Sequence, residues 1–275
     1  MKLIIESGSS KTLWAFIQES GIQVAETNGI NPTTQPEHHF HFGANFPKPL
    51  FYSVTRTFFY GAGVNTPETI NAVKNKLALA GIPGHVEVLP DVTGAARAAC
   101  MHGEGLVCIL GTGSNICYYD GQQVFTHTPA LGYILGDEGS GFALGRAVLQ
   151  SFFYNTMPPM VKEKFIHRYN LYLEDVLDRV YKKPGGNAFT ASFAQFLSEV
   201  ADTWKNNLLE KIFEEFVVNK ILTHPKAGHA PIHFTGSVAY YFQDSLKNVL
   251  HKFGLKATSI IQNPLDKLII YHEKD

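Results

Sequence analysis

The sequence predicts a two-lobed α/β protein, and three observations support this prediction. Its 275 residues approach the size at which one hydrophobic core stops growing, which favours two lobes over one. Short apolar, β-branched runs alternate with stretches of helical periodicity along the chain. The same succession of strand, Gly/Ser/Thr turn and strand begins near the N-terminus and again near Leu106. We therefore expect lobes of residues 1–103 and 104–275.

Composition and charge exclude several classes of protein. The chain is 45% hydrophobic and 17% charged, which is typical of globular proteins and unlike disordered or coiled-coil sequences. With 23 Lys plus Arg against 24 Asp plus Glu, the net charge of -1 gives no basic footprint for nucleic acid or anionic membrane. No apolar run is long enough to span a bilayer, and residues 1–6 lack a signal-peptide pattern. We expect a cytoplasmic protein that binds neither nucleic acid nor membrane.

The first lobe is predicted to open with a three-stranded meander. Strands are expected at residues 2–5, 13–17, 22–25, 57–60 and 86–89. Asn65-Thr66-Pro67-Glu68 has the polar cap, proline and acid of a helix start. An Ala-rich helix is expected at residues 92–101, so Asp91 lies between the last strand and this helix.

The second lobe is predicted to repeat this opening and then to become helical. Strands are expected at residues 106–110, 116–119, 124–126, 232–234 and 259–261. Helices are expected at residues 140–153, 161–169, 173–181, 189–222 and 237–253, with a last one after Pro264. Cys100, Cys108 and Cys117 lack the spacing of zinc ligands, so we expect buried free thiols.

Three Gly/Ser/Thr turns, each after a predicted strand, are candidates for phosphate binding. They are Ser7-Gly8-Ser9-Ser10-Lys11-Thr12, Gly111-Thr112-Gly113-Ser114-Asn115 and Thr235-Gly236-Ser237. Glycine lets backbone N–H groups approach phosphate oxygens without a Cβ clash, and hydroxyl groups add donors. One such turn is more typical of a simple hairpin, but the duplication favours a nucleotide site. The sequence contains no P-loop, dinucleotide, nucleophile-elbow or H-E-x-x-H motif.

Carboxylates at strand ends and helix starts supply further candidates. Asp91 would act as a general base toward a substrate hydroxyl, or it would cap the following helix. Asp137 and Glu138 lie between glycines at a helix start, which suits both ligand binding and stabilisation by the helix dipole. Glu6 interrupts an apolar strand, so it is either an exposed edge residue or a carboxylate that faces Mg²⁺. The residues alone leave these alternatives open.

The order of these motifs resembles the N-acetylglucosamine kinases and the related BadF/BadG/BcrA/BcrD ATPase family, in the actin, hexokinase and Hsp70 superfamily. The resemblance covers nearly the whole chain. The matching segments are Glu6–Thr12 and Leu110–Asn115 (phosphate motifs), Pro90–Ala95 (catalytic aspartate), Gly132–Ser140 (sugar-binding signature) and Phe234–Ala239 (adenosine motif). The resemblance implies an α/β, ribonuclease-H-like fold with duplicated βββαβα cores and an ATP cleft between the lobes.

The resemblance also implies ATP, Mg²⁺ and a small-molecule amino sugar as ligands. Asp91 would be the catalytic base, and Glu6, where the wider superfamily usually has Asp, would face the metal. The implied ATP-binding residues are Gly8, Ser9, Ser10, Lys11, Thr12, Thr112, Gly236 and Ser237. The implied substrate-binding residues are Asn31, Asp91, Ser114, Asn115, Leu131, Gly132 and Asp137. The resemblance further suggests a homodimer.

The expected function is ATP-dependent phosphorylation of N-acetylglucosamine to N-acetylglucosamine 6-phosphate. An alternative within the family is a kinase for N-acetylmuramic acid or another hexosamine. A second alternative is a BadF/BcrA-type ATPase that acts on a protein partner; such activators hold a [4Fe–4S] cluster between subunits through cysteines, and no close cysteine pair occurs here. A third alternative is a catalytically idle nucleotide sensor, against which the intact Asp91 and Asp137 argue.

Overall fold

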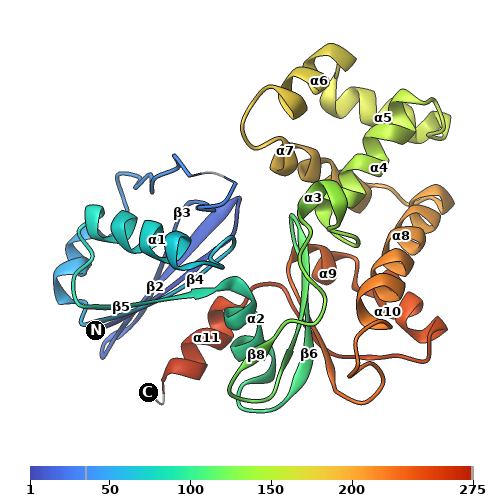
Figure 1. Cartoon of the computed structure of the whole chain (residues 1–275). Coiled ribbons are helices and arrows are strands. Elements are labelled where there is room, and N and C mark those ends of the chain that lie inside the picture. Colours follow the sequence, from blue (N-terminus) through green and yellow to red (C-terminus); the bar gives the residue numbers. More distant parts are fainter. Residues whose placement is uncertain (35, 274–275) are drawn as a thin grey trace. The chain divides into compact units, whose positions relative to one another are not determined.

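A computed structural model of the chain contains two compact units, each built around a five-stranded sheet (Figure 1). The structure describes residues 1–34 and 36–273. Unit 1 comprises residues 1–103, 119–124 and the segment that starts at Asn263, and unit 2 comprises residues 104–118 and 125–262. The helix after Pro264, which the sequence analysis assigned to the second lobe, therefore belongs to unit 1. In the described part of the chain, no helix is long and apolar enough to cross a membrane.

The sheet of unit 1 has the strand order β3-β2-β1-β4-β5. Its strands are β1 (Lys2–Ser7), β2 (Lys11–Gln18), β3 (Gly21–Asn28), β4 (Arg56–Gly61) and β5 (His85–Pro90). The first three strands form an antiparallel meander, whereas β4 and β5 run parallel to β1. Leu3, Ile4 and Ile5 are all fully buried, because both faces of the sheet are covered.

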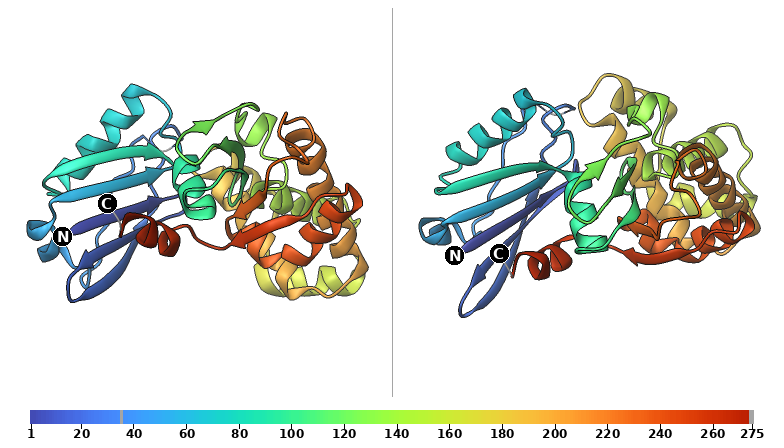
Figure 2. Two further views of the ribbon diagram at one scale, coloured as in Figure 1. Left: turned by 90° about the horizontal axis from the view of Figure 1, so that it is seen from below. Right: turned by 60° about the horizontal axis from the view of Figure 1, so that its bottom comes forward.

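Helices cover the two faces of this sheet. Helix α1 (Pro67–Leu79) begins with a capping box at Thr66 and packs Val73 and Leu77 into the core of one face. That core also contains Trp14, and it is closed by the loop that carries the 3₁₀ helix η1 (Lys48–Ser53). Helices α2 (Asp91–Cys100) and α11 (Leu265–His272) contact the sheet and each other. Figure 2 shows α11 beside β1, close to the N-terminus.

The sheet of unit 2 repeats this topology, with the order β10-β9-β6-β7-β8. Its strands are β6 (Gly105–Leu110), β7 (Ser114–Tyr119), β8 (Val124–Phe125), β9 (Ile232–Thr235) and β10 (Ala257–Ile261). Strand β6 is central, as β1 is in unit 1, and β9 and β10 follow it in parallel. The predicted duplicated α/β fold is therefore confirmed. Ser114 and Asn115, expected in a turn, instead begin β7.

Helices form most of unit 2 and bury an aromatic core that includes Phe165, Phe193 and Phe213. They are α3 (Gly132–Leu135), α4 (Gly141–Phe153), α5 (Pro159–Tyr169), α6 (Leu173–Tyr181), α7 (Gly186–Ser192), η2 (Phe193–Glu199), α8 (Thr203–Phe216), η3 (Val217–Ile221), α9 (Ser237–Tyr241) and α10 (Gln243–Lys252).

The prediction of one continuous helical stretch at residues 189–222 was wrong, because the helix is interrupted at Val200. Val200 has an extended backbone, and the side chain of Asp202 then accepts the Trp204 amide as the N-cap of α8. The stretch ends in a π-helical turn, η3, in which the Leu222 amide donates to the Val217 carbonyl at 2.9 Å. Helix 237–253 is likewise divided, into α9 and α10.

Candidate active site

The first Gly/Ser turn joins β1 to β2 and is shaped by buried hydroxyl groups. Ser7 Oγ lies 2.7 Å from Thr12 Oγ1, and Thr12 Oγ1 donates to the Asn28 carbonyl at 2.9 Å. The amide of Gly8 donates to the carbonyl of Lys11 at 2.9 Å and closes the turn. Thr12 is fully buried, so its side chain shapes the turn, whereas Ser10 and Lys11 are exposed at the tip.

The loop that contains Asn31 packs directly on this turn. A Cβ on Gly29 would lie 2.4 Å from the Gly8 carbonyl oxygen, so only glycine fits there. Asn31 is buried, and its Nδ2 donates to Ser9 Oγ at 3.1 Å. Its Oδ1 accepts the amides of Thr33 and Thr34 at 3.0 and 3.1 Å. Asn31 therefore couples the expected sugar loop to the expected phosphate turn and keeps one amide hydrogen for a ligand.

Two carboxylates of unit 1 lie at the carboxyl ends of parallel strands. Ser7, which follows Glu6, is aligned with Gly61, and Gly61 is aligned with Pro90. Asp91 follows Pro90 as the first residue of α2. Its Oδ1 accepts the Val92 amide at 2.8 Å, but the N-cap is Pro90, so the capping alternative for Asp91 is wrong.

Burial keeps both carboxyl groups easier to protonate than in water. Loss of solvation raises the pKa of Asp91 to about 6. The hydrogen bond from the Val92 amide stabilises the ionised carboxylate and partly offsets this rise. Loss of solvation also raises the pKa of Glu6 to about 7. The negative charge of Asp91 raises this pKa further, whereas the positive charge of Lys11 lowers it. A pKa near 6 leaves Asp91 ionised at neutral pH yet basic enough to accept a proton.

The carboxylate of Glu6 has the donor chemistry of a magnesium ligand. Mg²⁺ is usually bound through one or two carboxylates together with substrate phosphates, and it keeps several waters. A cation beside Glu6 would favour the ionised carboxylate that burial disfavours. Among residues 1–34 and 36–273, no group of three or more His, Cys, Asp or Glu side chains is arranged so that it could hold a metal ion by itself.

In unit 2, the second phosphate turn, the start of α4 and the adenosine motif meet at the carboxyl ends of β6 and β9. The amides of Gly141 and Phe142 donate to the carbonyls of Gly111 and Thr112 at 2.7 and 3.0 Å. Gly236 has a φ of +113°, and a Cβ there would lie 2.3 Å from the Leu110 carbonyl oxygen. Contacts of the main chain thus bring these three expected motifs together.

Ser237 is exposed next to Gly236, as the first residue of α9. The backbone of Thr112 holds the start of α4, and Thr112 itself is half-buried. Both residues can therefore reach a ligand at this edge of the sheet of unit 2.

The acidic loop before α4 carries Asp137 in a left-handed conformation, with a φ of +58°. Its Oδ1 accepts the Ser114 amide at 3.1 Å, and a Cβ on Gly113 would lie 2.6 Å from its Oδ2. Burial raises the pKa of Asp137, whereas the Ser114 amide and the charge of Lys220 lower it. Ser114 Oγ is buried and has no hydrogen-bond partner within the described part of the chain.

The other expected sugar residues flank this loop. Asn115 uses its Oδ1 to accept the Ile116 amide at 2.9 Å. Leu131 is 52% exposed and precedes the short helix α3, which begins at Gly132. The amide of Gly136 donates to the Gly132 carbonyl at 2.9 Å, so α3 leads directly into the acidic loop.

Lys220 was missed by sequence reasoning. Its side chain is 7% exposed, and its Nζ lies 3.6 Å from Glu138 Oε2. The one available signal was a lysine between apolar residues and Asn219 in η3, and a lone lysine there is equally typical of an exposed helix position.

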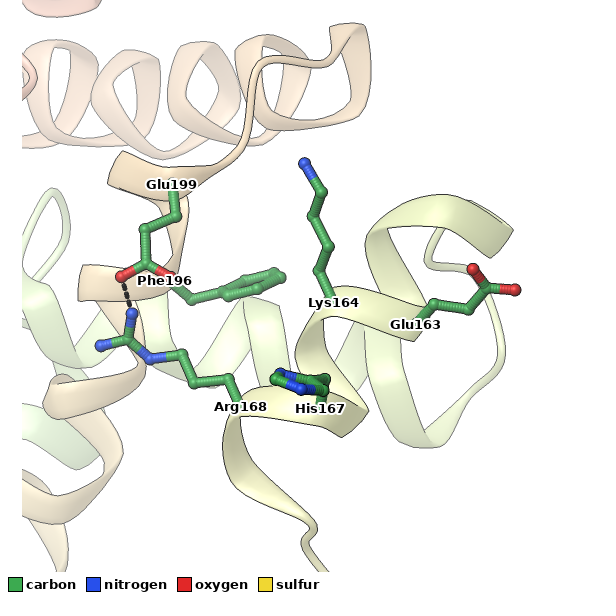
Figure 3. Close-up of a pocket in the computed structure, with 6 residues that line it drawn as sticks. All are labelled: Glu163, Lys164, His167, Arg168, Phe196 and Glu199. Atoms are coloured by element: carbon green, nitrogen blue, oxygen red, sulfur yellow. Dashed lines mark ion pairs between the residues drawn. The ribbon is translucent and has the colours of Figure 1, made fainter.

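A separate hollow of about 830 Å³ lies on α5 and η2 (Figure 3). Its lining residues are Glu163, Lys164, His167, Arg168, Phe196 and Glu199. Arg168 and Glu199 form an ion pair within it (Figure 3). None of the expected site residues lines this hollow, and none of the lining carboxyl groups belongs to a glycine-rich turn. We therefore locate the candidate site at the strand ends instead.

Comparison with known proteins identifies the family. A crystal structure from Porphyromonas gingivalis, described as that of a candidate N-acetylglucosamine kinase, is 35% identical, with a TM-score of 0.88, and the match covers 100% of this chain and 99% of that chain. The chain belongs to the N-acetylglucosamine kinase family. The resemblance seen in its motifs is thereby confirmed.

Two further proteins are similar to the chain, one in fold and one over a short segment. A candidate N-acetylglucosamine kinase from Chromobacterium violaceum has the same fold at 14% identity, with a TM-score of 0.72 and 98% of each chain covered. A curated N-acetylmuramic acid/N-acetylglucosamine kinase from Clostridium acetobutylicum is 32% identical over 96 residues. That match spans 33% of this chain and 31% of the curated relative, about a third of each. No family model matches the chain.

Proposed function

We propose that this member of the N-acetylglucosamine kinase family is an ATP-dependent amino-sugar kinase that converts N-acetylglucosamine to N-acetylglucosamine 6-phosphate. The observation that carries the proposal is the position of Asp91, a half-buried carboxylate at the first turn of α2 with a pKa raised to about 6. The similarity along the whole chain to a candidate N-acetylglucosamine kinase supports the choice of acceptor. In this proposal, Asp91 accepts the proton of the sugar hydroxyl that attacks the γ-phosphate.

The other residues of unit 1 would stabilise and position the phosphates. Phosphoryl transfer spreads negative charge over the moving group, so the enzyme mainly needs donors and cations fixed in advance. The tip of the turn at Ser9–Lys11 would supply these donors, because the Gly8 amide already donates to the Lys11 carbonyl. Mg²⁺, held by Glu6 and the phosphates, would neutralise charge on the nucleotide when bound.

The residues of unit 2 would bind the rest of the two substrates. Thr112, Gly236 and Ser237 would contact the nucleotide, and the free hydroxyl of Ser114 together with Asp137 would bind sugar hydroxyls. Asn31, Asn115, Leu131 and Gly132 would complete the sugar site. Membership of the BadF/BadG/BcrA/BcrD ATPase family, a cytoplasmic location and a homodimer stay predictions.

N-acetylmuramic acid is the second candidate acceptor, because the curated relative is named for both sugars. Its lactyl carboxylate would need a cation to bind. The loop at Asp137 and Glu138 carries two acids against the one ammonium of Lys220. This excess of negative charge disfavours an anionic sugar, so we place N-acetylglucosamine first.

The test is ADP release from Mg-ATP by the purified protein, measured alone and with N-acetylglucosamine, glucosamine, N-acetylmuramic acid, N-acetylmannosamine and glucose. Stimulation by N-acetylglucosamine above the other sugars is the expected result. Preference for N-acetylmuramic acid would overturn the choice of acceptor. ADP release that no sugar stimulates would favour an ATPase that acts on a protein partner, and absence of ADP release would favour an idle nucleotide sensor.

A further inference from the structure

A buried ion pair links the acidic loop to an unusual turn of helix in unit 2. Lys220 lies in η3, and its Nζ lies 3.6 Å from Glu138 Oε2. The side chains of Lys220 and Glu138 are 7% and 21% exposed. π-helical turns are rare and are frequently found at functional sites; this one continues directly from the end of α8.

The acidic loop also touches the helix that leads into this turn. Gly139 has a φ of +74°, and a Cβ there would lie 2.9 Å from the Cβ of Phe216, the last residue of α8. The loop therefore lies directly against the α8–η3 junction. Any side chain larger than the hydrogen of glycine at residue 139 would push the loop away from η3. The distance between Lys220 Nζ and Glu138 Oε2 would then increase.

The charge of Lys220 acts on both acids of the loop. Glu138 Oε2 is buried and has no hydrogen-bond partner in the structure, so Lys220 is the group that compensates its charge. The charge of Lys220 also favours the ionised form of Asp137. Asp137 in turn accepts the amide of Ser114, whose buried hydroxyl has no partner.

We propose that Lys220 is a positioning residue for the acceptor sugar, which holds Glu138 and thereby fixes Asp137 and Ser114 for sugar binding. The proposal rests on the proposed function, because it assumes that Asp137 and Ser114 bind the sugar. Lys220 does not touch the substrate. It acts through Glu138, and the π-helical turn sets the point from which its ammonium reaches that carboxylate.

The test compares steady-state kinetics of three variants with the unsubstituted protein. Lys220→Met removes the charge and keeps much of the apolar stem, Glu138→Gln removes the partner, and Lys220→Arg restores the cation. Lys220→Met and Glu138→Gln should each raise the KM for the sugar about tenfold or more, with the KM for ATP changed less than about twofold. Lys220→Arg should recover part of the loss. Lys211→Met, at an exposed position of α8, is the matched control and should change neither KM.

Several outcomes would overturn the proposal. One is a sugar KM in Lys220→Met within about twofold of the unsubstituted value. Another is a parallel rise of both KM values with a lower melting temperature, which indicates a merely structural role. If Lys220→Met does not fold, the double variant Lys220→Met/Glu138→Gln decides the question, because it removes both charges of the pair and leaves neither uncompensated. Absence of sugar-stimulated turnover in the unsubstituted protein would instead overturn the proposed function, and this inference with it.

Discussion

Replacing Glu6 by Gln should stabilise the protein at alkaline pH while impairing the reaction. Burial raises the pKa of Glu6 from its ordinary value of 4.5 to about 7. Between these two pH values the folded state binds more protons than the unfolded state, so Glu6 lowers stability progressively as the pH rises. Gln has nearly the same shape as Glu and cannot ionise, so the stability of the variant does not fall with pH for this reason.

The size of the effect follows from the two pKa values. A pKa difference of about 2.5 units, at about 1.4 kcal/mol per unit, limits the effect on the free energy of unfolding to about 3 kcal/mol. Proton linkage gives about 3 kcal/mol of added stability at pH 8 and less than about 1 kcal/mol at pH 5. The sign is the reverse of that for a carboxylate in a favourable salt bridge, whose removal destabilises the protein at neutral pH.

The assay is urea unfolding of Glu6→Gln and of the unsubstituted protein at pH 5 and pH 8, without nucleotide or Mg²⁺. Glu26→Gln is the matched control, because Glu26 is exposed on β3 in the same sheet. The control should show no gain that grows with pH. A Glu6→Gln protein that is no more stable than the unsubstituted one at pH 8, or that is equally stabilised at both pH values, would refute the burial argument. With the same two proteins in native buffer containing Mg-ATP, Mg²⁺-dependent ADP release by Glu6→Gln should be at least about tenfold lower if Glu6 holds the metal.

The other predictions concern catalysis, the first turn and the thiols. Asp91→Asn should lower kcat by roughly 10²–10⁴ with little change in sugar affinity, and retained turnover in a kinetic assay would remove Asp91 from the role of base. In the unsubstituted protein, kcat/KM should rise as the pH increases through about 6, where Asp91 ionises, and a flat profile would contradict this role. Gly29→Ala should cost about 1–3 kcal/mol in urea unfolding, because its Cβ would meet the Gly8 carbonyl; Gly43→Ala, where a Cβ meets nothing within 4 Å, should not. Cys108, which is fully buried and whose pKa burial raises, should resist a thiol reagent until the protein unfolds, and rapid labelling of the native protein would contradict its burial.

Much of the fold could be predicted from local sequence because its strands and turns have local causes. Apolar runs such as 2–5 and 13–17 fix the strands, and the Gly/Ser turn between them fixes the hairpin. The helix at residues 173–181 was predicted with its observed limits. The break at Val200 was missed because the surrounding apolar residues continue the helical pattern, although Asp202 offered a capping signal. The membership of α11 in unit 1 depends on contacts with β1 far away in sequence, which no local pattern reveals.

The residues of the candidate site could be predicted only where a short sequence pattern indicates them. Asp91 was found because a polar residue follows an apolar strand, and the glycine turns were found because close backbone approach requires glycine. Lys220 was not found, because its role depends on an ion pair with Glu138, which lies 82 positions away in the sequence. It also depends on a π-helical turn that the residue types of η3 do not predict. The buried hydroxyl of Ser114 was named from the family motif, but its missing partner is a property of the folded chain alone.

The attachment of α11 to unit 1 determines when this unit can finish folding during synthesis. His272 is buried and stacks on Phe58 at 3.8 Å between ring centroids, and its Nε2 lies 2.7 Å from the hydroxyl of Tyr60. Lys2 Nζ donates to the carbonyl of His272 at 2.7 Å. Residues 1–103 therefore remain without one of their covering helices until α11 has also left the ribosome. During that interval an apolar face of the sheet is open to chaperones, and a truncation before Leu265 would leave unit 1 without this helix and unable to mature.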